Sequence, residues 1–296
     1  MDISVIIPCF NNERYLTRCL GALRAQTYPR DRYETILIDN NSTDRSLEVA
    51  RGFPEVAVLQ EPRQGSYAAR NLGVRHARGG ILVFTDSDCE PRPDWLAETA
   101  AALAAPGAIL TLGSRRNARE SFAIRMLADY DDEKAAYVCS QSDPRLYFGY
   151  TNNLAVRREA FERCGPFLET MRGADSIFVH RVLAAYGAGS VRHAPAAEVR
   201  HLEIESAWDW YGKMNLYGRS FRKHRARSQR RPLTLRERFE VMARTVARNR
   251  YSRFDAVALF AMLAVGLVPF QLGRLLPSRS RLPRSAPADS RAGSRD

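Results

Sequence analysis

The chain has 296 residues, 45% hydrophobic and 26% charged, which is enough for one large α/β domain with an appendage and an ample core. Its 5 cysteines show no paired spacing, which argues against a disulfide framework or a zinc ribbon and favours a reducing compartment. The net charge of +12 is concentrated from Arg219 onward, where 19 Lys and Arg face 5 Asp and Glu, so the first 218 residues carry only −2.

Strand-like and helix-like segments alternate in the first third of the chain. The predicted strands are Ile3–Ile7, Glu34–Ile38, Val56–Gln60 and Ile81–Phe84, and the predicted helices are Glu13–Ala25, Arg45–Arg51 and Ser66–Ala77. The first strand is expected to end at Pro8, and Ser42 or Thr43 to cap the second helix. Short alternating units predict an α/β fold with a doubly wound, mostly parallel sheet, in which ligands bind outside the carboxyl ends of the strands.

Two aspartates, Asp86 and Asp88, follow the fourth predicted strand, and Pro91 then prevents that strand from continuing. Carboxylates on alternate residues suit a divalent cation that shares its coordination with a phosphate, because Mg²⁺ and Mn²⁺ prefer hard oxygen ligands. A solvated acidic turn is the alternative. The segment 8–12 and Asp39 end two other predicted strands, so three separate segments are expected to meet in one crevice.

Five sequence blocks carry a family resemblance. In chain order they are ISVIIPCFNNERYLTRCLGAL, ETILIDNNSTDRS, GSYAARNLGVRHARGGILVFTDSDCEPRPDWL, YTNNLAVRREAFERCGPF and RGADSIFVHRV. Over roughly Asp2 to His201 the chain resembles family 2 glycosyltransferases of the GT-A fold, the nucleotide-diphospho-sugar transferase type. The resemblance implies an enzyme that moves a sugar from a nucleoside diphosphate donor to a hydroxyl acceptor, with inversion and with a divalent metal, Mn²⁺ or Mg²⁺.

The resemblance assigns the nucleoside end of the donor to residues near the first two strands. Pro8, Phe10 and Asn11 match positions beside the nucleoside, and Asp39 matches the aspartate that binds the base. A carboxylate accepts the imide N–H of uracil, and an aromatic edge packs on a base or ribose, so a UDP-sugar is favoured. The alternative for Asp39 is an Asx-type turn.

The resemblance places the rest of the donor and the metal further along the chain. Arg70 and Asn71 match a segment beside the donor, although Arg70 also suits an exposed helix face. Asp88 is expected to bind the metal directly, and Asp86 to reach the ribose or the metal. His201 is a further candidate ligand, because imidazole suits Mn²⁺, with a purely structural histidine as the alternative.

Asp175 is the candidate general base that takes the proton of the acceptor hydroxyl. The family usually shows Glu-Asp here, whereas this chain has Ala174 before Asp175. Because a predicted helix follows, an N-cap role is the alternative for Asp175. Asn152, Asn153 and Gly173 are candidate acceptor-side residues, with simple turn positions as the alternative for the two asparagines.

A group of four acidic residues lies between the donor and acceptor blocks. Its members are Asp129, Asp131, Asp132 and Glu133. The simplest interpretation is a solvated helix face, and a lid over the acceptor is the alternative.

The chain is expected to divide into a catalytic domain at 1–205, a basic helical extension at 206–276 and a disordered tail at 277–296. Within the catalytic domain, 1–95 is the nucleotide-sugar half and 96–205 the acceptor half. The apolar run 256–272 is predicted to associate with a membrane, as an embedded hairpin arm or a single span, or else to pack on the catalytic domain as a helix.

Arginines flank the apolar run on both sides, which suits an anionic membrane surface. No signal peptide is expected at Met1, so the prediction is a protein on the cytoplasmic face of the cell membrane. A membrane-proximal enzyme suggests a lipid-linked or cell-surface glycan precursor as acceptor.

Two other functional classes compete with an active enzyme. A catalytically degenerate GT-A scaffold or binding module is motivated by Ala174. A nucleic-acid-binding protein is supported only by the arginine-rich segment Arg219–Arg231, which no recognition motif accompanies, so no nucleic-acid partner is expected.

Overall fold

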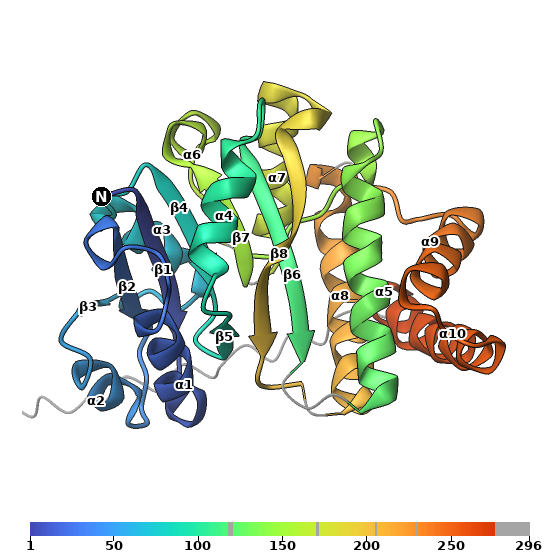
Figure 1. Cartoon of the computed structure of the whole chain (residues 1–296), viewed down its shortest axis with the longest axis horizontal. Helices are drawn as coiled ribbons and strands as arrows, with labels where there is room; N and C mark the ends of the chain where they lie inside the picture. Colours follow the sequence, from blue (N-terminus) through green and yellow to red (C-terminus); the bar gives the residue numbers. More distant parts are fainter. Residues whose placement is uncertain (118–120, 170–171, 205, 229, 276–296) are drawn as a thin grey trace, which may run out of the picture.

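The computed structural model describes residues 1–117, 121–169, 172–204, 206–228 and 230–275 (Figure 1). The tail predicted at 277–296 lies outside the described residues.

An eight-stranded sheet in the order β3-β2-β1-β4-β7-β6-β8-β5 forms the centre of the fold. The strands are β1 (Ile3–Cys9), β2 (Tyr33–Asp39), β3 (Val56–Gln60), β4 (Ile81–Thr85), β5 (Cys89–Pro91), β6 (Leu110–Asn117), β7 (Asn153–Arg157) and β8 (Val191–His201). Strands β7 and β5 run antiparallel to their neighbours and the others share one direction. The predicted mostly parallel α/β sheet is therefore confirmed.

Helices cover both faces of this sheet (Figure 1). They are α1 (Glu13–Arg24), α2 (Ser46–Arg51), α3 (Ser66–His76), α4 (Trp95–Ala104), α5 (Phe122–Cys139), α6 (Arg158–Cys164), α7 (Ala174–Tyr186), α8 (Ala207–Ser228), α9 (Leu235–Asn249) and α10 (Arg253–Leu275). Side chains of β1 alternate between the two layers: Val5 and Ile7 pack with α1 and α4, whereas Ile6 packs with α3 and α5. Two hydrophobic cores, one on each face, hold the sheet in place.

Strand β1 continues through Pro8 to Cys9, so the predicted end of the strand at Pro8 is wrong. Proline has no N–H to give to a neighbouring strand. Here none is needed, because β4 pairs with β1 only as far as Phe84, which lies opposite Ile6.

The predicted caps of the second helix are also wrong. Helix α2 begins at Ser46, whose backbone N–H donates to the Asp44 carboxylate at 3.0 Å. The hydroxyl of Ser42 instead accepts the N–H of Asn11 at 3.1 Å. Ser42 therefore does not cap a helix but joins the loops after β1 and β2 at the edge of the sheet.

The acidic group on α5 is not a solvated face, because Asp129, Asp132 and Glu133 are buried. Each of these carboxylates has hydrogen-bond or ion-pair partners from other elements. The partners are Arg116 and Tyr251 for Asp129, Ser114 and His193 for Asp132, and Arg248 for Glu133. The acidic group thus joins β6 and β8 to the C-terminal helices. Buried carboxylates need such partners, so these hydrogen bonds and ion pairs explain why the group can be buried.

The C-terminal extension packs against the catalytic part, as Figure 1 shows for α8, α9 and α10 beside α5. Trp210, Val241 and Leu259 belong to the same buried core as the residues of the sheet. Helices α8 and α10 approach closely at glycines: a Cβ on Gly218 would lie 2.1 Å from the Phe270 carbonyl oxygen. Of the three alternatives for the apolar run, the structure contains the helix packed on the domain.

Helix α10 nevertheless has the length and composition of a membrane span, with 23 residues and an 18-residue window whose mean hydropathy is 2.0. Only 17% of that window is buried, so most of its residues are exposed or half-buried. It continues through Pro269, whose carbonyl accepts a hydrogen bond from the Asn215 side chain of α8 at 3.1 Å. Packing on α8 and an exposed apolar surface therefore coexist in one helix.

Candidate active site

Loops that follow β1, β2 and β4 meet at the carboxyl edge of the sheet. The Asn12 side chain donates to the Ser87 hydroxyl at 2.7 Å, which joins the first loop to the Asp86–Asp88 turn. The Asn11 side chain accepts the Thr43 N–H at 2.7 Å, which joins it to the loop after β2. The three segments expected to converge therefore meet at one edge of the sheet, and we call the place where they meet the crevice.

The residues predicted at the nucleoside lie around the first two loops. Phe10 is 51% exposed, which leaves its ring available for contact, whereas Pro8 is buried within β1. Asp39 is buried at the end of β2, and its carboxylate accepts the N–H of Ser42, three residues on, at 3.4 Å. An Asx turn uses the N–H two residues on, so this long bond only resembles the predicted turn. A carboxylate offers more acceptor positions than this bond uses, and the turn is compatible with a contact to a base.

Arg70 forms an ion pair with Asp86 and is buried, so it is not an exposed helix-surface arginine. Its guanidinium lies 5.4 Å from the centre of the Tyr67 ring, which adds a cation–π contact. The neighbouring Asn71 donates to the Phe167 carbonyl at 2.9 Å and accepts its N–H at 3.1 Å. These bonds support a structural role for Asn71.

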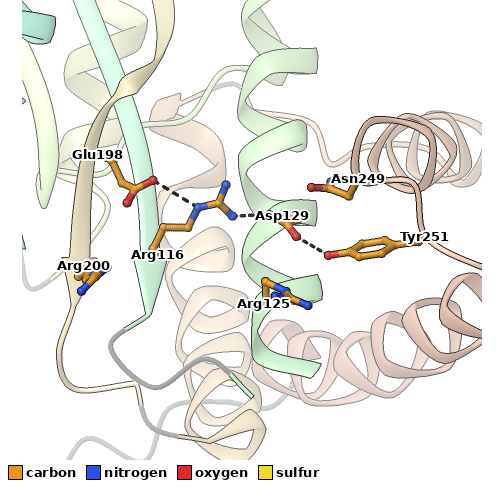
Figure 2. Close-up of a pocket in the computed structure, with 7 residues that line it drawn as sticks. All are labelled: Arg116, Arg125, Asp129, Glu198, Arg200, Asn249 and Tyr251. Carbon is orange, nitrogen blue, oxygen red and sulfur yellow. Dashed lines mark hydrogen bonds and ion pairs between the residues drawn. The ribbon is translucent and has the colours of Figure 1, made fainter. Parts of the chain in front are cut away.

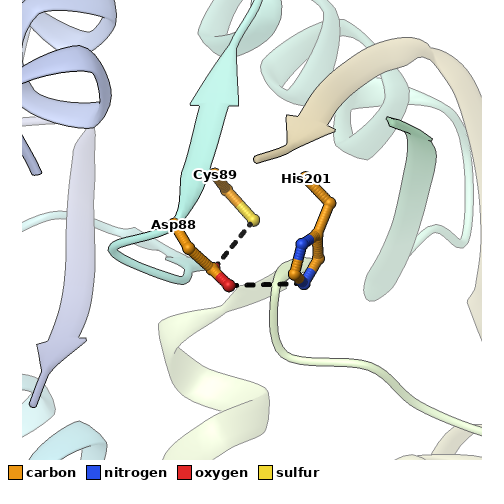
Figure 3. A group of neighbouring side chains, drawn as sticks. All are labelled: Asp88, Cys89 and His201. Carbon is orange, nitrogen blue, oxygen red and sulfur yellow. Dashed lines mark hydrogen bonds and ion pairs between the residues drawn. The ribbon is translucent and has the colours of Figure 1, made fainter. Parts of the chain in front are cut away.

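Strand pairing brings Asp88 to His201. Cys89 on β5 lies opposite His201 on β8, and the Asp88 carboxylate is 3.5 Å from His201 Nε2 (Figure 3). Burial and the charge of Asp86 raise the pKa of Asp88 to about 7. Burial and the nearby Lys213 lower the pKa of His201 to about 4, so the imidazole is neutral at pH 7, the form that binds metals.

The donor atoms of Asp88, Cys89 and His201 lie within 4.8 Å of one another. Burial raises the pKa of the Cys89 thiol well above its ordinary value, and the protonated sulfur is a poor ligand for a hard cation. The His201 Nδ1 is buried without a partner among the described residues. Asp88 and His201 therefore fit a divalent cation such as Mn²⁺, and Cys89 does not.

Sequence reasoning missed Lys213, which α8 brings to within 3.3 Å of His201 Nε2 and 3.1 Å of Glu203. An isolated lysine on a helix carries no local signal, because the packing of α8 against the sheet decides where it points. An ammonium beside the aspartates is suited to contact the phosphates of a donor.

Asp175 is the second residue of α7, and the N-cap position is taken by Gly173 with φ of 89°. The predicted N-cap role of Asp175 is therefore wrong. Its carboxylate accepts the Ser176 N–H at 2.7 Å, and burial raises its pKa, opposed by the nearby charges of Arg70 and Arg230. Ala174 is buried in the core, where an acidic side chain would need a buried partner.

The two acceptor-side asparagines have different environments. Asn153 accepts a hydrogen bond from Trp95 at 2.9 Å and donates to the carbonyls of Ser114 and Ala197, so its amide joins four elements of the fold. Asn152 keeps a buried Oδ1 without a partner among the described residues. Only Asn152 has a free polar atom for an acceptor.

Unpartnered buried polar atoms gather around this crevice. In the part of the chain that the structure describes, they are Arg70 Nε, Asn152 Oδ1, His201 Nδ1, Arg230 Nε and Arg158 Nη2. All except the last belong to residues at the crevice. Since buried polar groups are normally paired, their concentration here indicates a site for a polar ligand.

A pocket of about 550 Å³ lies elsewhere, between β6, β8, α5 and the α9–α10 connection (Figure 2). It is lined by Arg116, Arg125, Asp129, Glu198, Arg200, Asn249 and Tyr251. Arg200 and His201 are consecutive in β8, so their side chains point to opposite faces of the sheet. The pocket is therefore separate from the crevice of Asp88 and Asp175.

Comparisons with solved structures agree with this fold. The Staphylococcus aureus TarS structure in complex with UDP aligns with a TM-score of 0.56 at 18% identity, covering 93% of this chain and 90% of that one. A mannosyltransferase from Pyrobaculum calidifontis in complex with GDP-Man and Mn²⁺ aligns with a TM-score of 0.62 at 21% identity, covering 92% and 82%. At such identities these similarities establish the fold alone.

Sequence comparisons establish the family. Glycosyltransferase AglE of Haloferax volcanii is 34% identical over 170 residues, which cover 56% of this chain and 55% of AglE, so the chain spans about half of that relative. A dolichyl N-acetylglucosaminyl phosphate glucuronosyltransferase of Methanococcus voltae is 32% identical over 100 residues, covering 32% of this chain and 31% of that protein. The family described as "Glycosyl transferase family 2" matches residues 4–165, which confirms the resemblance drawn from the five blocks. The chain belongs to glycosyltransferase family 2.

Proposed function

We propose that this protein transfers a sugar from a nucleoside diphosphate donor to a hydroxyl acceptor with inversion at the anomeric carbon. The observation that carries the proposal is the crevice itself. It gathers the pair Asp86 and Asp88, the neutral His201 and the half-buried Asp175 at the carboxyl edge of the sheet.

Asp88 and His201, with Asp86 beside them, are the residues that would hold a divalent cation. Such a cation, when bound, acts as a Lewis acid that neutralises charge on the diphosphate leaving group. Arg70 orients Asp86 through their ion pair. Lys213 lies on the same side and supplies a further positive charge for the phosphates.

Asp175 would act as the general base. The acceptor hydroxyl attacks the anomeric carbon as the bond to the diphosphate oxygen breaks, and Asp175 takes the hydroxyl proton. Arg70 and Arg230 oppose the rise in the pKa of Asp175 and so favour its ionised, reactive form. The unpartnered Oδ1 of Asn152 is available to accept a hydrogen bond from another hydroxyl of the acceptor.

We propose a UDP-sugar as the donor. In this proposal Asp39 would accept the imide N–H of uracil, and Phe10 and Asn11 would flank the nucleoside. The relatives use more than one nucleotide: the TarS structure contains UDP, and the Pyrobaculum mannosyltransferase structure contains GDP-Man. The base contact of Asp39 is what favours uracil for this chain.

We propose that the enzyme works at the cytoplasmic face of a membrane on a lipid-linked or cell-surface glycan precursor. Large apolar side chains are exposed along α9 and α10: Leu235, Phe239, Phe254, Val257, Phe260, Val265, Val268, Leu272 and Leu275. Such a continuous apolar surface suits the interface of a bilayer, and the arginines of both helices suit anionic headgroups. The name of the Methanococcus voltae relative describes a dolichyl-linked acceptor, which fits this proposal.

Donor turnover tests the enzymatic proposal. The full-length chain is incubated with UDP-glucose, UDP-N-acetylglucosamine or GDP-mannose, with Mn²⁺ or with a chelator, and release of nucleoside diphosphate is measured. Metal-dependent release from a UDP-sugar is the expected result. Binding of UDP without any release, in the presence of membrane extracts that supply acceptors, would instead support a catalytically degenerate scaffold.

A further inference from the structure

The C-terminal extension brings an arginine into the acceptor side of the crevice. Arg230 lies between α8 and α9, and its Nη1 donates to the hydroxyl of Ser176 at 3.2 Å. Ser176 directly follows the proposed base Asp175 in α7. The guanidinium also lies over two aromatic rings, 5.7 Å from the centre of Phe148 and 5.9 Å from that of Phe221.

The neighbouring residue fixes this position. Arg231 forms ion pairs with Asp143 at 2.7 Å and with Glu237 at 2.8 Å, and its backbone N–H donates to the Arg145 carbonyl at 2.9 Å. Glu237 in turn completes the capping box of α9 with Thr234. The chain is therefore held against the catalytic domain at the residue that follows Arg230.

Arg230 itself lacks such partners. Its Nε is buried without a hydrogen bond, and no carboxylate among the described residues lies within ion-pair distance of it. Burial lowers the pKa of Arg230 to about 10, so it remains a cation at pH 7. Arg230 is a half-buried residue whose guanidinium has five N–H donors and, among the described residues, one hydrogen bond. It is therefore matched to an anion, because phosphates and carboxylates accept two of its donors at once.

We propose that Arg230 forms an anion subsite for the acceptor, so that the acceptor carries a phosphate or carboxylate group near the hydroxyl that attacks. This inference rests on the proposed function, because it needs the acceptor to lie beside Asp175. The anionic group has two possible sources, a lipid phosphate embedded in the membrane and a soluble phosphorylated polyol. The test therefore includes a pair of probes for each.

The test measures binding by the full-length chain saturated with UDP and Mn²⁺, which occupy the donor phosphate site. Calorimetry compares farnesyl phosphate with farnesol, and glycerol 3-phosphate with glycerol. We expect the phosphate member of one pair to bind at least about tenfold more tightly than its neutral partner, since charge-assisted hydrogen bonds are the strong ones. The pair that shows this preference identifies the source.

Three variants test whether Arg230 causes the preference for the phosphate probe. Arg230→Gln should abolish it, Arg230→Lys should retain part of it, and the matched control Arg219→Gln, which removes an exposed charge of α8, should leave it intact. The affinity for UDP, measured in the same variants, reports an intact fold. The inference is overturned if neither pair shows a preference, or if Arg230→Gln keeps it. Loss of UDP binding by the unmodified chain would instead overturn the proposed function.

Discussion

Replacing Asp175 with asparagine tests the proposed chemistry most directly. The substitution keeps the size and shape of the side chain and removes its ability to take a proton. Positioned proton transfer contributes roughly 10²–10⁴-fold to a rate, so turnover with an acceptor should fall by about that factor. Donor affinity should change little, because Asp86 and Asp88, not Asp175, would meet the diphosphate.

The structure also indicates that the fold will tolerate this change. Asp175 is in the first turn of α7, where a negative charge stabilises a helix by about 0.3–1 kcal/mol through the helix dipole. Burial raises the pKa of Asp175 in the folded state, so its ionisation opposes folding as the pH rises through that value. An asparagine loses the stabilisation by the helix dipole but also removes the cost of ionising a buried carboxylate. The net change in the free energy of unfolding at pH 7 should therefore be small.

The same pKa shift predicts a pH dependence. The base must be ionised, so the rate should fall as the pH drops through the raised pKa of Asp175, above the usual value of about 3.9 for an aspartate. In the Asp175→Asn variant, measured at saturating Mn²⁺ so that Asp88 stays ionised, this acidic limb should disappear from the residual rate.

The assay is release of UDP in the presence and absence of an acceptor, between pH 5 and 9, for the parent, Asp175→Asn and the matched control Asp31→Asn. Asp31 is exposed before β2, at the opposite edge of the sheet. Near-parental turnover of Asp175→Asn would refute the reasoning. The acidic residues of α5 would not then be ready substitutes, because Asp129 and Asp132 are buried and engaged with other side chains.

Three further changes test other parts of the structure. Asp88→Asn should abolish Mn²⁺-dependent binding of UDP, because an amide is a poor ligand for a hard cation; unchanged binding by calorimetry would exclude Asp88 as a ligand. The double change Phe254→Ser with Val257→Ser should strongly reduce cosedimentation with anionic lipid vesicles, since both side chains are exposed on α10. Cosedimentation equal to that of the parent would contradict the membrane proposal. Leu259→Ala should lower the free energy of unfolding by about 2–5 kcal/mol, because Leu259 is fully buried, and a loss below about 1 kcal/mol in a denaturant titration would show that α10 is not part of the core.

The sequence predicts most of the nucleotide-sugar half, because its signals are local. Alternating apolar runs give β1 to β4 with errors only at their ends, and the aspartates at 86 and 88 follow directly from the end of β4. The sequence also gives His201 as a candidate metal ligand, because it follows a strand-like segment. Its contact with Asp88, however, depends on the register in which Cys89 pairs with His201, and no local pattern encodes that register.

The errors on the acidic group of α5 and on the apolar run share a physical cause, which is that partners distant in sequence decide which residues are buried. Asp129 has the sequence context of a surface residue, but Arg116 of β6 and Tyr251 of the α9–α10 connection bind its carboxylate in the fold. Gly266 interrupts the apolar run in sequence, yet in space it is where the Trp210 ring approaches α10: a Cβ there would lie 2.6 Å from that ring. Side-chain identity alone does not distinguish these cases from solvated or flexible positions.

The basic segment 219–231 shows how one compositional feature divides into separate roles. Read as a whole, its charge indicates attachment to an anionic membrane surface. Its last two residues bind the catalytic domain and α9 instead. Arg231 forms ion pairs with Asp143 and Glu237, and Arg230 donates a hydrogen bond to Ser176 beside the proposed base. If α9 and α10 bind a membrane through their exposed apolar side chains, the packing of α9 on the catalytic domain, which Arg231 and Glu237 secure, also holds Arg230 in the crevice. Membrane attachment and completion of the acceptor site would then depend on the same C-terminal extension. A membrane-embedded acceptor would bind Arg230 close to the surface by which the protein binds the membrane.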